Sequence, residues 1–170
     1  MVNYMANKVE NIFSKDGSTS LENVPTEKYL TFFIDEQLFA IQSSQVVEII
    51  RMQPITFMPK LPPFVKGVIN LRGNVLPVID LKRRLNLPQQ ETTEEARIII
   101  VKVEEISVGM MVDAVSEVMT INQQNIDSPD VVAGSVSSNY LSGVGKLDNR
   151  LLILLNLETI IGLGAEINQV

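Results

Sequence analysis

The 170-residue chain contains no cysteine, no histidine and no tryptophan. Without cysteine it forms no disulfide and offers no thiolate metal ligand, which fits a cytoplasmic protein. Without histidine it lacks the usual general base near neutral pH and the commonest metal ligand. Serine–histidine and cysteine–histidine nucleophile systems are therefore excluded, which argues against an enzyme.

The remaining candidates for catalytic or metal chemistry are weak. Glu104 and Glu105 fall at a predicted hairpin turn, where charged side chains are normally solvated. The stretch from Asp127 to Asp130 has too few oxygen ligands at the spacing of a calcium loop. No apolar run approaches the roughly 18–20 residues that cross a membrane, so direct insertion is not expected.

Charge is spread unevenly along a chain whose net charge is −6. Residues 1–28 carry a net −1, residues 29–85 a net +3 and residues 86–170 a net −8, which together give −6. Such a split is either ordinary solvated surface or a means of steering different protein partners to different faces. Aromatic residues make up only 5% of the chain, so it is a poor match to a nucleic-acid binder.

An internal duplication is the most informative pattern that is present. A slide of 69 places lays Phe39-Ala40-Ile41 on Val108-Gly109-Met110 and Glu48 on Glu117, and a slide of 76 lays Asp80-Leu81 on Asn156-Leu157. The repeat units are about 29–85 and 98–161, with the 7 extra residues (76 − 69) expected between Asn122 and Asn139. A unit of that size is small for an independent core, so the two units are expected to support each other.

Short strands and turns dominate the expected local structure. We expect hairpins over Tyr29–Ile41 and Val65–Ile79, and an extended segment over Val46–Arg51. Ser44 and its counterpart Asp113 are predicted to cap helical turns, as Asp80 caps Leu81–Leu85 and Asn156 caps Leu157–Ile161. Pro77 cannot donate to a ladder, so its strand should lie at an edge or carry a bulge. The pattern indicates small barrels, and duplicated barrels can exchange strands.

Glu48 and Arg72 form the most interesting pair of charges. Glu48 recurs as Glu117 after a mostly apolar stretch, and Arg72 lies at a predicted hairpin tip in the same unit. We expect them to form a partly buried ion pair, whose one-sided loss would cost about 3–5 kcal/mol. The pair either ties a loop down or lines a docking surface, and the two roles are compatible.

A family resemblance rests on two blocks of sequence. Lys66-Gly67-Val-Ile-Asn70-Leu-Arg72-Gly73 is followed by Pro77-Val-Ile-Asp80-Leu, and Gly109-Met-Met-Val-Asp-Ala-Val-Ser-Glu117-Val lies downstream. Over residues 29–161 the chain resembles the family of the bacterial chemotaxis coupling protein CheW. The resemblance implies an all-β fold of two intertwined five-stranded SH3-like barrels, with each repeat unit contributing to one barrel. It implies domain bounds of 28–164, with flexible tails at 1–27 and 165–170.

The resemblance also implies a function without catalysis, cofactor or metal. The protein would be an adaptor, monomeric when free, that binds the CheW-like regulatory domain of the histidine kinase CheA and the cytoplasmic tips of chemoreceptors in membrane-associated arrays. Matching positions associated with the receptor are Val46, Glu48, Gly109, Val115 and Val118. Matching positions associated with the kinase are Lys66, Gly67, Asn70 and Arg72.

Alternative functions remain open at this point. The chain could be a CheW-like module cut from a larger chemotaxis protein, either CheA or CheV, although it ends shortly after Ile161. A small-barrel nucleic-acid-binding protein is a further alternative that the acidic composition disfavours.

Overall fold

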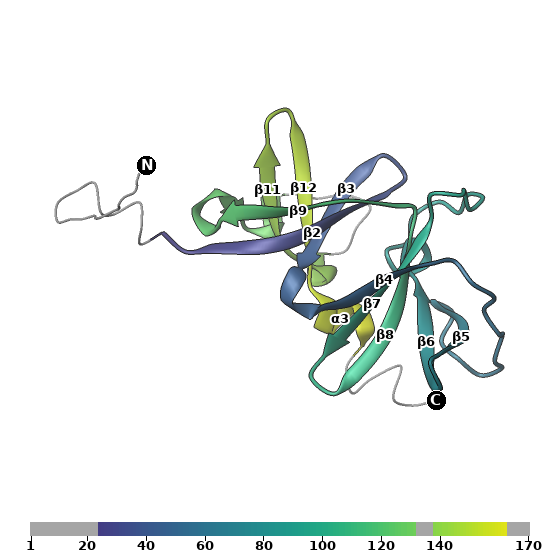
Figure 1. Ribbon diagram of the computed structural model, residues 1–170. Coiled ribbons are helices and arrows are strands. Elements are labelled where there is room, and N and C mark those ends of the chain that lie inside the picture. Colours follow the sequence, from purple (N-terminus) through teal and green to yellow (C-terminus); the bar gives the residue numbers. More distant parts are fainter. Residues whose placement is uncertain (1–23, 132–137, 163–170) are drawn as a thin grey trace, which may run out of the picture.

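The computed structural model describes residues 24–131 and 138–162 (Figure 1). The predicted tails lie outside this range apart from residues 24–27, and the first strand already begins at Thr26, two residues before the expected start of the domain at residue 28. Most of the polar stretch expected to hold the 7-residue insertion is described, but residues 132–137 are not.

The two repeat units contain the same elements in the same order. The first has β2 (Thr26–Ile34), β3 (Gln37–Gln42), β4 (Val46–Arg51), β5 (Val65–Leu71), β6 (Asn74–Asp80) and α2 (Leu81–Arg84). The second has β7 (Arg97–Val103), β8 (Ile106–Val112), β9 (Ala114–Asn122), β11 (Leu141–Leu147), β12 (Arg150–Leu155) and α3 (Leu157–Ile161). Short additions are β10 (Ile126–Asp127) and the 3₁₀ turns η2 (Ser43–Gln45), η3 (Gln123–Asn125), η4 (Pro129–Val131) and η5 (Ser138–Tyr140). The predicted duplication is therefore present in the fold.

The strands form two sheets that exchange segments between the units. The six-stranded sheet has the order β10-β11-β12-β3-β2-β9, and the five-stranded sheet has the order β4-β7-β8-β6-β5. The parallel pairs β12–β3 and β6–β8 join strands of different units. The mainly β, intertwined fold is thus confirmed, but the expectation that each unit contributes to one barrel is wrong, because each unit supplies strands to both sheets.

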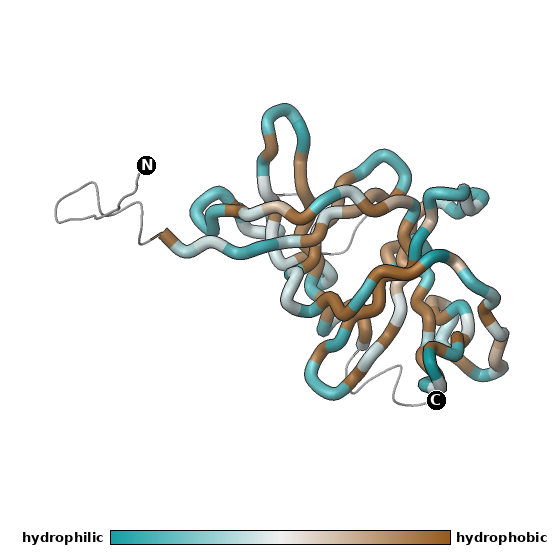
Figure 2. The backbone as a smooth tube through the Cα atoms, viewed as in Figure 1, coloured by the Kyte–Doolittle hydropathy of each residue, from teal (hydrophilic) through white to brown (hydrophobic). Residues whose placement is uncertain are grey.

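Strands buried on both faces explain why the two sheets share a core. On β7, Ile98 and Ile100 pack inside the five-stranded sheet, whereas Ile99 and Val101 pack in a large cluster that also holds Phe32 of the other sheet. Successive side chains of a strand point to opposite faces, so an unbroken run of β-branched residues fills both layers. The apolar segments accordingly meet at the centre of the molecule (Figure 2).

The helix caps predicted at Asp80 and Asn156 are confirmed, whereas those predicted at Ser44 and Asp113 are wrong. Asp80 Oδ1 accepts a hydrogen bond from Arg83 N, and Asn156 Oδ1 accepts one from Thr159 N, both at 3.3 Å. Ser44 instead lies inside η2, whose N-cap Gln42 makes no side-chain capping bond. Asp113 lies between two strands and caps no helix, because its carboxylate is bound by groups from other elements.

Pro77 does not mark an edge strand. β6 lies second from the edge, between β8 and β5. Its pairing with β8 begins only at Val78, so Pro77 lies just before that ladder and its missing N–H interrupts none of these pairs. The bulge in this hairpin is on β5, between Val65 and Gly67, rather than at Pro77.

Candidate functional site

Glu48 and Arg72 come from opposite edges of the five-stranded sheet and contact each other. Arg72 Nη1 donates to Glu48 Oε2 at 2.5 Å and Arg72 Nη2 to Glu48 Oε1 at 2.9 Å, a bidentate pair. Arg72 stands at the β5–β6 turn, and Glu48 lies on β4 at the far edge of the same sheet. The predicted ion pair is therefore present, and it links the two ends of the strand order.

The pair lies at the surface, which corrects the expected burial. The Arg72 side chain is 69% exposed and the Glu48 side chain 28% exposed, so the large cost of breaking a buried pair does not apply. The hydrogen bonds from Arg72 hold the pKa of the Glu48 carboxyl below its ordinary value, with the charge of Arg72 acting in the same direction and partial desolvation opposing it. The two hydrogen bonds thus hold the Glu48 carboxylate in place and favour its ionised form.

The β5–β6 turn that carries Arg72 is braced by Asn70. Arg72 has a φ of 52° and Gly73 a φ of 89°, so both central residues lie in the left-handed region. Asn70 Oδ1 accepts a hydrogen bond from Gly73 N at 2.9 Å, which holds this tight turn. Asn70 therefore has a structural task in presenting Arg72, whether or not it also touches a partner.

Apolar and polar side chains surround the ion pair. A hollow of about 610 Å³ holds Glu48 and Arg72, and the rest of its lining is partly apolar (Val47, Leu71, Val75, Leu76 and Ile100) and partly polar (Asn74, Glu105 and Ser107). Val47 is 56% exposed and Val75 66% exposed. Exposed apolar side chains around a fixed ion pair are typical of a protein-binding surface.

The other two residues that the resemblance associates with the kinase, Lys66 and Gly67, differ in their exposure. Lys66 is exposed on β5. Gly67 is buried, and a Cβ atom there would lie 2.3 Å from the carbonyl oxygen of Thr56. Thr56 and Val68 exchange two backbone hydrogen bonds of 2.9 Å, so the absence of a side chain at Gly67 lets the preceding loop attach to β5.

The residues associated with the receptor do not form one patch. Val46 and Val115 are half-buried against the shared core, on the five-stranded and six-stranded sheets respectively. Val118 is 55% exposed on β9. Gly109 is buried on β8, where a Cβ would lie 2.7 Å from Ile98 Cγ2, so it shapes the sheet from inside and offers no contact at the surface.

A buried lysine was missed at the sequence level. Lys82 Nζ lies 3.1 Å from Asp35 Oδ1 and 3.2 Å from Asp113 Oδ2, and its side chain is 9% exposed. Asp113 Oδ2 also accepts a hydrogen bond from Asp35 N at 2.6 Å. The cluster connects α2 with the β2–β3 turn of the other sheet. Asp113 is the one member of this cluster to which the sequence drew attention, as the counterpart of Ser44, but it was interpreted as a helix cap.

Within residues 24–131 and 138–162, no group of three or more acidic side chains is arranged to hold a metal ion. None of the helices in this part of the chain is long and apolar enough to cross a membrane. What the fold does present is two interleaved sheets, one of which carries an exposed ion pair beside exposed valines, an arrangement typical of a small binding module.

Comparison with known proteins gives this module a family. The family model of the CheW-like domain matches residues 28–164, so the chain belongs to the CheW-like family. It is 38% identical to the chemotaxis protein CheW of Bacillus subtilis over 79% of this chain and 86% of that protein. It is 29% identical to the CheW of Helicobacter pylori over 92% of this chain and 98% of that protein. The crystal structure of the scaffolding protein TtCheW from Thermoanaerobacter tengcongensis matches with a TM-score of 0.74 and 33% identity, over 80% of this chain and 88% of that one.

Proposed function

We propose that the protein is a non-catalytic scaffold that couples the cytoplasmic tips of chemoreceptors to the histidine kinase CheA. The observation that carries the proposal is the match of the CheW-like family over residues 28–164. It is supported by similarity along most of the chain to proteins named as chemotaxis and scaffolding proteins. In this function the protein works in the cytoplasm, is monomeric when free, and joins membrane-associated arrays by binding receptors rather than lipid.

The proposed receptor contacts are Val46, Glu48, Gly109, Val115 and Val118, and the proposed kinase contacts are Lys66, Gly67, Asn70 and Arg72. Exposure separates direct from indirect roles among them. Glu48, Lys66, Arg72 and Val118 have side-chain atoms at the surface. Gly67 and Gly109 are buried and act by allowing close packing beneath the surface.

Reconstitution tests this function most directly. Receptor-containing membrane vesicles, the kinase and labelled ATP are mixed with or without the protein, and phosphate incorporation into the kinase is measured. We expect receptor control of kinase autophosphorylation only when the protein is present. A pull-down with the tagged protein should retain both the kinase and the receptors.

The variant Arg72→Asp sharpens the test, since it leaves two carboxylates where the ion pair stood. We expect it to lose one or both partners in the pull-down while its fold, followed by circular dichroism, stays intact. Retention of both partners by Arg72→Asp would contradict the site. A protein that recovers neither kinase nor receptor in its unaltered form would contradict the function itself.

A further inference from the structure

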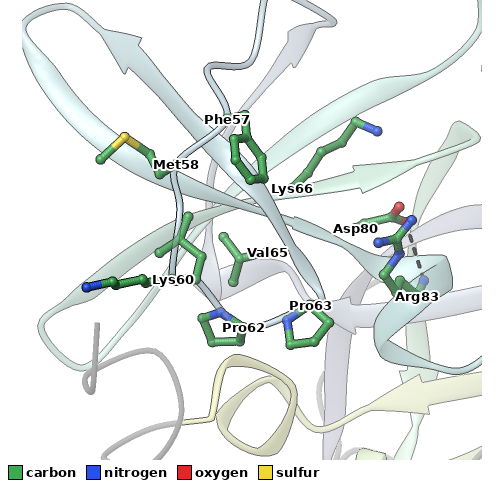
Figure 3. A pocket seen from close by; sticks show the side chains of 10 residues that line it. Phe57, Met58, Lys60, Pro62, Pro63, Val65, Lys66, Asp80 and Arg83 are labelled. Atoms are coloured by element: carbon green, nitrogen blue, oxygen red, sulfur yellow. Dashed lines mark hydrogen bonds between the residues drawn. The ribbon is translucent and has the colours of Figure 1, made fainter.

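A second hollow lies on the five-stranded sheet beside the proline-rich loop that joins β4 to β5. Its volume is about 290 Å³, and its lining includes Phe57, Met58, Lys60, Val65, Lys66 and Arg83. In Figure 3 the Lys60 side chain extends on one side of Val65, and Lys66 and Arg83 lie on the other. Cationic groups therefore flank an apolar floor.

The three cations are not engaged within the protein. Lys60, Lys66 and Arg83 are all exposed, and none forms an ion pair with any residue between 24 and 131 or 138 and 162. The carboxylate that lines the hollow, Asp80, is 7% exposed and accepts the hydrogen bond from Arg83 N that caps α2. The surface thus offers an excess of positive charge to solvent.

The duplication shows that the fold does not need this charge. The slide of 76 places Ser142 where the first unit has Lys66, and Thr159 where it has Arg83. The strands and helices around these positions are the same in both units. A backbone that forms equally well with Ser142 and Thr159 leaves the cations of the first unit without a structural purpose.

The loop also exposes large apolar side chains next to a residue that is hydrogen-bonded to β5. Phe57 is 77% exposed and Met58 44% exposed. Just before them, Thr56 is bonded to Val68 of β5 by two backbone hydrogen bonds. An exposed phenylalanine on an anchored loop loses little conformational entropy on binding, as preorganised contacts do.

We propose that the hollow formed by Phe57, Met58, Lys60, Val65, Lys66 and Arg83 docks a segment of a partner protein in which carboxylates flank a large apolar side chain. The apolar group would rest on Val65 against Phe57 and Met58, and the carboxylates would meet the unpaired cations. Charge complementarity selects an acidic partner, and the apolar floor selects a polypeptide over a free anion. The inference goes beyond the proposed adaptor function, because it fixes the chemistry of the docked segment; since Lys66 is also a proposed kinase contact, the kinase is one protein that could carry such a segment.

Synthetic peptides provide the probe. Three 12-residue peptides are titrated into the ¹⁵N-labelled full chain: one with a leucine flanked by glutamates, one with the glutamates replaced by lysines, and one with the leucine replaced by serine. We expect only the first to bind, with amide shifts concentrated at residues 56–68 and 80–84. Binding should weaken as salt rises, because exposed charges are screened.

Variants that copy the second unit test the cations. Lys66→Ser combined with Arg83→Thr should weaken binding about tenfold, and Phe57→Ser should weaken it by a similar factor. Lys146→Ser removes an exposed lysine from β11 on the other sheet and should leave binding unchanged.

Equal binding of the lysine peptide, or shifts outside these segments, would overturn the proposal. Self-association of the protein that disappears in Lys66→Ser with Arg83→Thr, measured by sedimentation, would replace the partner with a second copy of this chain. Receptor and kinase pull-downs are run on the same proteins. If the unaltered protein binds the peptide but pulls down neither receptor nor kinase, the adaptor function is contradicted and the proposal for the hollow still stands.

Discussion

The two repeat units share their elements and differ in the charges at equivalent turns. In the first unit Glu48 and Arg72 form a bidentate pair. The equivalent residues of the second unit are Glu117 and Asp148, two acids that cannot pair with each other. Conversely, Asp80 and Asn156 cap equivalent helices through the same bond. The two units therefore agree in their helix caps and differ in the charges at their turns.

The two units also differ at Lys82, the buried lysine of α2. It ties α2 to Asp35 and Asp113, whereas the equivalent residue of α3 is the exposed Glu158, with Glu104 at the position equivalent to Asp35. Only one of the two related junctions between the sheets thus carries a buried cation. The sheets are held together asymmetrically, in spite of their common origin.

Replacing Lys82 should have the largest effect on stability. Lys82→Met keeps most of the apolar stem but leaves Asp35 and Asp113 without their cation. We expect a loss of about 2–3 kcal/mol, somewhat less than for a fully buried pair because the two carboxylates are 27% and 32% exposed. Urea unfolding measures it. Glu158→Met is the matched control and should change the free energy of unfolding by less than about 0.5 kcal/mol.

The glycines Gly67 and Gly143 occupy equivalent places and should respond differently to alanine. At Gly67 the added Cβ meets the Thr56 carbonyl oxygen at 2.3 Å, a backbone atom that cannot move without breaking the bridge to Val68. At Gly143 it meets Ile126 Cγ2 at 2.5 Å, a side chain that can shift, and the nearest backbone atom, the Asp127 carbonyl oxygen, is farther away at 3.1 Å. We expect losses of about 2 kcal/mol for Gly67→Ala and about 1 kcal/mol for Gly143→Ala. Equal losses in urea unfolding would show that the Thr56 bridge is not what restricts Gly67.

The features that could be predicted from the sequence are those formed by residues close together in the chain. Hairpins, the caps at Asp80 and Asn156, and the order of elements in each unit follow from turn residues and short apolar runs. The pairing of Glu48 with Arg72 was also predicted, because the two lie within one unit and Arg72 stands at a predicted hairpin tip. These features need no knowledge of how distant strands are paired.

The exchange of strands was not predictable in the same way. β6 pairs with β8, and β12 with β3, through contacts that no local pattern specifies, since either partner offers a similar apolar face. The cap assigned to Asp113 failed for a related reason: its true partners, Asp35 and Lys82, belong to the other unit. Residues whose contacts cross between the units are where sequence reasoning was weakest.

Alkaline titration should distinguish the lysine junction from the rest of the molecule. Burial tends to lower the pKa of Lys82, but the hydrogen bonds and charges of Asp35 and Asp113 outweigh it, so the pKa lies above 10.5. A folded-state pKa above the unfolded value gives stability that is full below the unfolded pKa and is lost as pH rises through the folded pKa. The unaltered protein should therefore lose stability above about pH 10.5 more steeply than Lys82→Met, as measured by urea unfolding at each pH. Parallel pH curves for the two proteins would contradict this.

The smallest effect on stability is expected at the Glu48–Arg72 pair, where the effect on function should be greatest. The hydrogen bonds from Arg72 lower the pKa of Glu48, so the pair is complete above the ordinary carboxyl pKa and is lost as pH falls through the lowered value. Carboxyl ¹³C shifts should show that pKa returning toward 4.5 in Arg72→Gln, with little change in the urea midpoint, because the pair is exposed.

The exchange Glu48→Arg with Arg72→Glu then separates two roles. If the pair only fixes the turn, the exchanged protein binds its partners as before, whereas if each charge contacts a partner, binding is lost while the ion pair is kept.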